Sequence, residues 1–168
     1  MACLTSAIEP LRAANEIAGR EAFTWTLIAE TADRVKSSAK VAFDPDLLLQ
    51  EVQDLDFLFL LSGPTGVFAN PKIGNSKLRW LASRGVNLGG VSGGVFPLVR
   101  SGVMQGHRCS VHWCYKAAFG TEFPEMTTTD NVIAIDRRRY TVSGAAAAFD
   151  LMLRLIDDEL GSEVMTEV

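Results

Sequence analysis

Cysteine and histidine are scarce in this chain, which has three cysteines and two histidines among its 168 residues. An odd and small cysteine count excludes the disulfide framework that holds small secreted domains together. No apolar run approaches the roughly 20 residues that cross a membrane, and the N-terminus lacks the basic and apolar stretches of a secretory signal. We therefore expect a cytoplasmic protein that does not enter the membrane.

An excess of basic residues is also missing, since the formal net charge is −4. A domain that binds DNA by itself carries a basic face, so any DNA contact is expected to come from a separate domain. The one basic run, Arg137-Arg138-Arg139, lies between two strand-like segments. A solvated hairpin turn is its favoured interpretation.

What the chain does contain is an alternation of apolar strand and helix patterns. Strands are predicted over 23–29, 55–61, 86–91, 109–111, 127–129, 132–136 and 140–143. Helices are predicted over 6–18, 47–51, 75–84, 95–100, 113–119 and along an apolar stripe from 148 to 156. This order predicts one α/β domain over residues 1–168, with a doubly wound, mostly parallel sheet and helices on both faces. Such folds open with a central strand, so we expect that a first strand precedes Met1 and that segment 161–168 is cut short.

The motif best suited to chemistry is Gly90-Val91-Ser92-Gly93-Gly94, which follows a predicted strand and precedes a predicted helix. This is the context of a nucleophile elbow, where a tight turn aims one side chain into the crevice at the carboxyl end of a sheet. The alternative is a glycine-rich turn that lines a ligand crevice or has no chemistry at all.

A serine nucleophile needs a base, and His112 is the better placed of the two histidines. No acid lies between Ser92 and His112, which argues against an ordinary α/β-hydrolase. Glu9 is the candidate acid. Its alternatives are local, either a capping box with Ser6 or a cap just before Pro10.

A metal site is not expected, although two histidines and two cysteines fall within eight residues, at His107, Cys109, His112 and Cys114. Metal motifs pair distant halves of a site, and so short a span rarely closes a tetrahedron. No cofactor is expected either.

Five motifs occur in an order and spacing that resemble one family. They are Glu9-Pro10-Leu11-Arg12-Ala13-Ala14-Asn15, the elbow, 106–113, Phe123-Pro124 and 140–144 with Asp150-Leu151-Met152-Leu153. Together they resemble the ThiJ/PfpI (class I glutamine amidotransferase-like) sensor domain of AraC-type, GlxA-like regulators, above all regulators of quaternary-amine catabolism. The resemblance implies a flavodoxin-like sheet, a homodimer and a downstream helix-turn-helix domain that binds DNA.

This resemblance also implies the candidate site. As a sensor, the domain would bind a small effector such as glycine betaine or carnitine through Glu9, Gly63, Ser92, Gly93, His112 and Trp113. Trp113 would supply an aromatic wall, with plain core packing as its alternative. The elbow residue of ThiJ/PfpI proteins is usually cysteine, and the amidotransferase glutamate position is Cys114 here. An enzyme, a hydrolase or amidase with Ser92, His112 and Glu9 as catalytic residues, is thus the second hypothesis, and a stand-alone dimeric binding module is the third.

Overall fold

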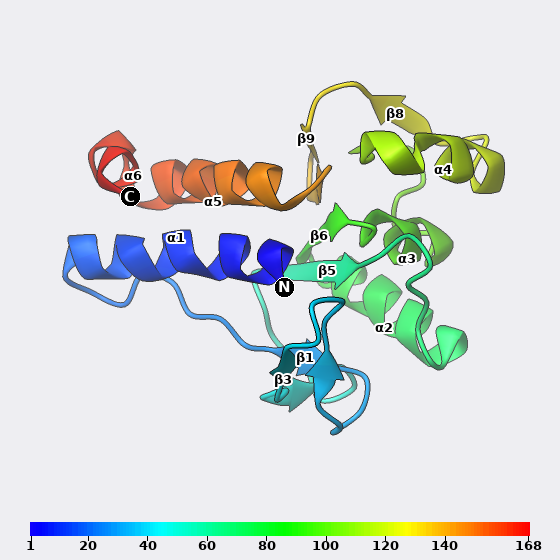
Figure 1. Ribbon diagram of the computed structural model, residues 1–168, viewed down its shortest axis with the longest axis horizontal. Coiled ribbons are helices and arrows are strands. Elements are labelled where there is room, and N and C mark those ends of the chain that lie inside the picture. The colour runs from blue at the N-terminus through cyan, green and yellow to red at the C-terminus, as the bar shows by residue number, and fades with distance from the viewer.

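A four-stranded sheet forms the centre of the computed structural model, which describes residues 1–168 (Figure 1). In sheet order the strands are β5 (Phe57–Ser62), β6 (Asn87–Ser92), β10 (Arg139–Val142) and β9 (Ile133–Asp136). The first three are parallel, and β9 pairs with β10 in the antiparallel direction. The predicted mostly parallel α/β sheet is confirmed.

Helices cover both faces of this sheet. The helices α2 (Pro71–Ser83) and α3 (Val95–Arg100) lie on one face, while α1 (Ala2–Ala18) and α5 (Ala145–Leu160) pack together on the other (Figure 1). Successive residues of a strand point to opposite faces. Leu88 of β6 accordingly joins the core under α2 and α3, and Val91 joins the core under α5.

Short elements complete the fold. β1 (Ile28–Ala29) and β4 (Leu47–Leu48) form a parallel pair, and β2 (Val35–Lys36) and β3 (Ala42–Phe43) form an antiparallel pair. β7 (Arg108–Ser110) pairs with β8 (Thr127–Thr129). Between these two strands lie the 3-10 turn η1 (Trp113–Tyr115) and α4 (Lys116–Glu122), and the chain ends in α6 (Ser162–Glu167).

Two predictions near the N-terminal third are corrected. The strand predicted over 23–29 is paired only at Ile28–Ala29, because Asn15 takes the backbone groups of Phe23 with its side-chain amide. The helix predicted over 47–51 is wrong. Its first residues form β4 against β1, and the Asp44 carboxylate pairs with Arg34 (2.7 Å) instead of capping a helix.

Two helices begin earlier than predicted. α1 starts at Ala2, so Pro10 lies inside the helix and does not open it. α2 starts at Pro71, because the Asn70 side chain accepts a hydrogen bond from the backbone N–H of Ile73 and so caps the first turn. The predicted basic hairpin turn between β9 and β10 is present. Its last arginine, Arg139, is half-buried and donates to the Val103 carbonyl (2.7 Å), so it is tethered rather than solvated.

Candidate functional site

Ser92 ends β6 in a backbone conformation that non-glycine residues rarely adopt. Its φ is 56°, in the left-handed region, which costs an L-residue about 1–2 kcal/mol. The Ser92 side chain is half-buried, and its hydroxyl makes no hydrogen bond to another residue. The predicted elbow is therefore present in geometry, with its hydroxyl unengaged.

Close packing of backbone against backbone explains the glycines of the elbow. A Cβ on Gly93 would overlap the carbonyl group of Gly63, and a Cβ on Gly94 would overlap the carbonyl oxygen of Leu60. Gly63 follows β5 directly. The turns after β5 and β6 thus touch, and they bring together two predicted ligand residues, Gly63 and Gly93.

His112 lies at the same edge of the sheet, above the end of β10. Its ring carbon Cδ2 is 3.5 Å from the position a Cβ would take on Gly144, which caps α5. Val142, two residues before Gly144, is the register partner of Val91, the neighbour of Ser92. Ser92 thus ends β6, while His112, which follows β7 in the chain, lies over the turn that follows the adjacent strand β10. No hydrogen bond joins the two side chains.

The imidazole of His112 is instead engaged by its own turn. Its Nδ1 accepts the backbone N–H of Cys114 (3.3 Å) and lies 2.8 Å from the Cys114 sulfur. Trp113 stacks on the His112 ring, with 5.7 Å between ring centroids, and is 78% exposed. The alternative that Trp113 is a core residue is wrong.

Glu9 lies within α1 and forms an ion pair with Arg12 (2.8 Å) on the next turn. Hydrogen bonds from Arg12 lower the pKa of the Glu9 carboxyl below its usual range. The helix begins seven residues before Glu9, so neither local capping role applies. All hydrogen bonds of its side chain go to Arg12, and none reaches Ser92 or His112.

The other members of the His/Cys-rich segment point elsewhere. Cys109 is fully buried, and burial raises the pKa of its thiol to about 11. His107 lies beside Asp136 and Arg137, where burial and then the charges of Arg137 and Arg139 lower its pKa. These side chains do not gather into a group that could hold a metal ion.

Two contacts of the site were not predicted. The first is the thiol of Cys114 on His112, and the second is Gly144 beneath the His112 ring. Gly144 carried a usable signal, because it ends a predicted parallel strand just before a helix, which is where ligand crevices form. The thiol contact depends on the tight turn at 112–114, and no sequence pattern marked that turn.

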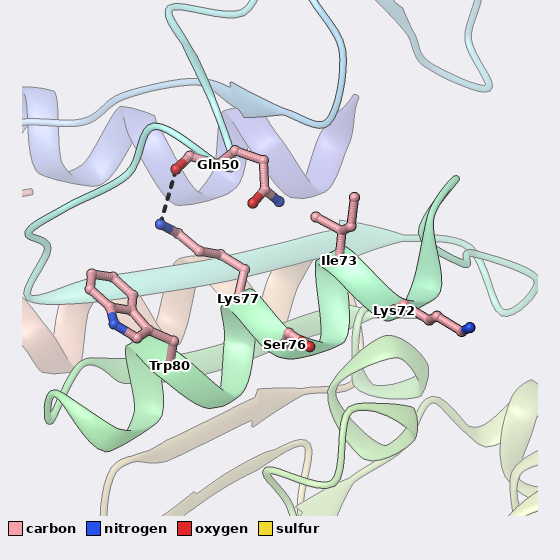
Figure 2. Close-up of a pocket in the computed structure, with 6 residues that line it drawn as sticks. All are labelled: Gln50, Lys72, Ile73, Ser76, Lys77 and Trp80. Atoms are coloured by element: carbon pink, nitrogen blue, oxygen red, sulfur yellow. Dashed lines mark hydrogen bonds between the residues drawn. The ribbon is translucent and has the colours of Figure 1, made fainter.

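A separate cavity of about 460 Å³ lies along the exposed side of α2 (Figure 2). Its lining residues are Gln50, Lys72, Ile73, Ser76, Lys77 and Trp80. The Lys77 ammonium donates to the Gln50 carbonyl (3.1 Å) and lies 4.3 Å from the Trp80 ring centroid, so its charge is already satisfied. None of these residues belongs to the elbow or to the predicted site.

The doubly wound sheet and the strained serine turn at its carboxyl edge define a flavodoxin-like domain with a nucleophile-elbow architecture. The chain belongs to the DJ-1/PfpI family, whose model matches residues 4–158. Its structure superposes on Drosophila melanogaster DJ-1beta with a TM-score of 0.75 at 20% identity, over 99% of this chain and 87% of that one.

Similar chains include transcriptional regulators. The regulator GbdR of Pseudomonas aeruginosa is 33% identical over 98% of this chain, which covers 45% of that protein. A solved AraC family transcriptional regulator from Pseudomonas putida has a TM-score of 0.88 at 27% identity, over 99% of this chain and 90% of the solved one. The chain spans about half the length of the curated relatives it matches. No helix in the structure has the length and apolarity of a membrane span.

Proposed function

We propose that this chain is the small-molecule-sensing domain of an AraC-type transcription regulator, with its effector site at the Ser92 elbow. Two observations support the proposal: Gly93 packs against Gly63 beside Ser92, and His112 lies over the end of the adjacent strand β10. The relatives of the chain are transcriptional regulators. Crevices at the carboxyl ends of parallel strands are the usual ligand sites of such sheets.

The donors at the elbow suit a small carboxylate. The Ser92 hydroxyl has no partner, and the Gly93 N–H makes no backbone hydrogen bond, whereas the Gly94 N–H is taken by the Val91 carbonyl (2.9 Å). Exposed aromatic rings bind quaternary ammonium groups through their faces, and Trp113 presents such a ring beside His112. These features and the resemblance support a quaternary amine with a carboxylate, such as glycine betaine or carnitine, as the effector.

Calorimetric titration of the chain with glycine betaine and with carnitine tests this effector class. We expect saturable binding that Trp113→Ala weakens at least tenfold. Trp80→Ala is the matched control, because Trp80 lies on α2 beside Lys77 and away from the elbow. Absence of heat and of thermal stabilisation with both compounds would contradict the effector class.

A second candidate function is hydrolysis of a small ester or amide, which the left-handed backbone of Ser92 favours. Ser92 would be the nucleophile and His112 the base, with Glu9 as the orienting acid. Turnover would require His112 to exchange its Cys114 partner for Ser92. The hypothesis predicts ester hydrolysis that Ser92→Ala abolishes, and no hydrolysis above buffer would contradict it for the substrates tried.

The setting of the domain is part of the proposal. We propose that it works in the cytoplasm as a homodimer, that a strand precedes Met1 and that DNA is bound by a helix-turn-helix domain after Val168. Reading the gene on both sides of the segment tests the last two points. A regulator requires further in-frame codons that encode paired helix-turn-helix units, whereas a stop codon after Val168 would leave a stand-alone binding module.

A further inference from the structure

The three cysteines of the chain differ sharply in access. Cys109 is fully buried, Cys3 is half-buried on α1, and Cys114 is exposed. Cys114 is also the only one whose sulfur lies beside an imidazole, at 2.8 Å from Nδ1 of His112. An accessible thiol next to a base has the arrangement of an activated nucleophile.

The hydrogen bonds around His112 fix which nitrogen can act. Nδ1 accepts the backbone N–H of Cys114 (3.3 Å), so it carries no proton in the neutral ring. The same lone pair faces the thiol. Two rings keep the imidazole in this orientation. Trp113 stacks on it with 5.7 Å between ring centroids, and the Tyr115 ring lies with its centroid 5.1 Å away.

We propose that Cys114 is a modification site for low-molecular-weight disulfides, with His112 as its base. In the reaction, Nδ1 of His112 takes the thiol proton, and the thiolate attacks one sulfur of the disulfide. A new S–S bond forms between Cys114 and that sulfur while the original S–S bond breaks. The leaving thiolate takes the proton back from His112, so the products are a mixed disulfide and one free thiol.

The step uses His112, which also belongs to the proposed effector site, but it does not involve the elbow serine. The other two cysteines act as internal references within the same molecule. Burial that raises the pKa of Cys109 to about 11 keeps that thiol protonated at neutral pH and closed to reagents. Cys3 is half-buried by the packing of α1 on α5, and its thiol makes no hydrogen bond to another side chain.

The chromogenic disulfide dithiobis-nitrobenzoate, applied to the folded chain, tests the proposal. We expect one thiol per chain to react in a fast phase. This fast phase should be lost in Cys114→Ser and kept in Cys3→Ser. In His112→Asn the amide oxygen can still accept the Cys114 N–H but cannot take a proton. That variant should slow the fast phase at neutral pH about tenfold or more, and its difference from wild type should shrink as the pH is raised.

Either of two results would overturn the proposal. One is a fast phase that survives Cys114→Ser, since the reactive thiol would then be another cysteine. The other is an equal rate in His112→Asn and wild type across the pH range, since His112 would then be no base. Circular dichroism of each variant shows whether it is folded, and Trp80→Phe on α2, away from His112, provides a second variant that should retain the fast phase.

Discussion

Ser92 holds the chain in a strained conformation at the point where chemistry or binding is expected. Glycine adopts a φ of 56° without the steric cost that Cβ imposes on other residues. Strain of this kind persists where the surrounding structure over-determines it, and it clusters at functional sites. The conformation of Ser92 is thus a cost in stability that the elbow imposes.

Substituting Ser92 measures that cost. We expect Ser92→Gly to be more stable to urea than Ser92→Ala by about 1 kcal/mol, because only glycine relieves the left-handed strain. In a regular strand the order is usually the reverse, and the glycine variant is the less stable of the two. Equal or lower stability of the glycine variant would mean that Ser92 is not strained in solution.

Two other glycines, Gly94 and Gly120, should respond to substitution by alanine in opposite ways. A Cβ on Gly94 would overlap the Leu60 carbonyl oxygen, so we expect Gly94→Ala to destabilise the chain by about 3 kcal/mol. Gly120 in α4 has nothing within 4 Å of the same position, and Gly120→Ala should stabilise by about 0.5–1 kcal/mol through helix propensity. Urea denaturation of both variants checks the opposite signs, and a loss of stability in both would contradict the packing argument.

At the scale of elements, β5 is an edge strand whose outer side has no partner. Asn87 donates to the Asp56 carbonyl (2.9 Å), and the parallel register then assigns Leu58 and Leu60 to the bonds with β6. Phe57, Phe59 and Leu61 direct their backbone groups to the open side.

Hydrogen exchange should show this alternation. We expect the amides of Leu58 and Leu60 to be protected and those of Phe59 and Leu61 to exchange faster. A longer chain in which a first strand pairs with β5 should protect both sets. Uniform protection in the present chain would show that another partner already covers the edge.

The β9–β10 hairpin carries a pH-sensitive cluster. Burial first, then Arg137 and Arg139, lower the pKa of His107, with Asp136 opposing. The unfolded chain then binds a proton more readily than the folded one, so stability rises with pH and is lost as pH falls through the unfolded pKa of about 6.5. We expect His107→Gln to flatten this loss in urea denaturation between about pH 5 and 8. The same slope in variant and wild type would assign the loss to other groups.

The sequence predicts well those elements that a local residue pattern determines. The apolar run of β5 and the apolar stripe of α5 can be predicted because buried segments are apolar. The glycines of the elbow can be predicted because a tight strand-to-helix turn has a fixed length. The pattern of residues 23–27 predicts a strand, but the segment pairs with no strand of any sheet. Asp44-Pro45 predicts a helix start, although Leu47–Leu48 pairs with β1. Strand pairing is non-local, so neither outcome is visible in the segment itself. The contact of Cys114 with His112 is local, yet it depends on the geometry of the η1 turn.

At the scale of the whole molecule, the charge decides what this chain can do alone. Its net charge of −4 opposes binding to the phosphate backbone, which requires clustered cations. The three consecutive arginines do not form such a cluster. Arg138 donates to the Gly85 carbonyl (2.7 Å) and Arg139 to that of Val103 (2.7 Å), so two of the three are committed to the fold.

We therefore expect the 168-residue chain to show no binding to duplex DNA in gel-shift assays at low salt. A longer product of the gene that includes a helix-turn-helix domain should bind, with an affinity that falls steeply as salt rises. If effector binding at the elbow controls the regulator, adding the effector should change the affinity of the longer product for its operator DNA. Binding to unrelated DNA should stay unchanged, because only the specific complex depends on how the two DNA-binding units are held. DNA binding by the short chain itself would contradict this division of labour and would assign a nucleic-acid surface to the sensor fold.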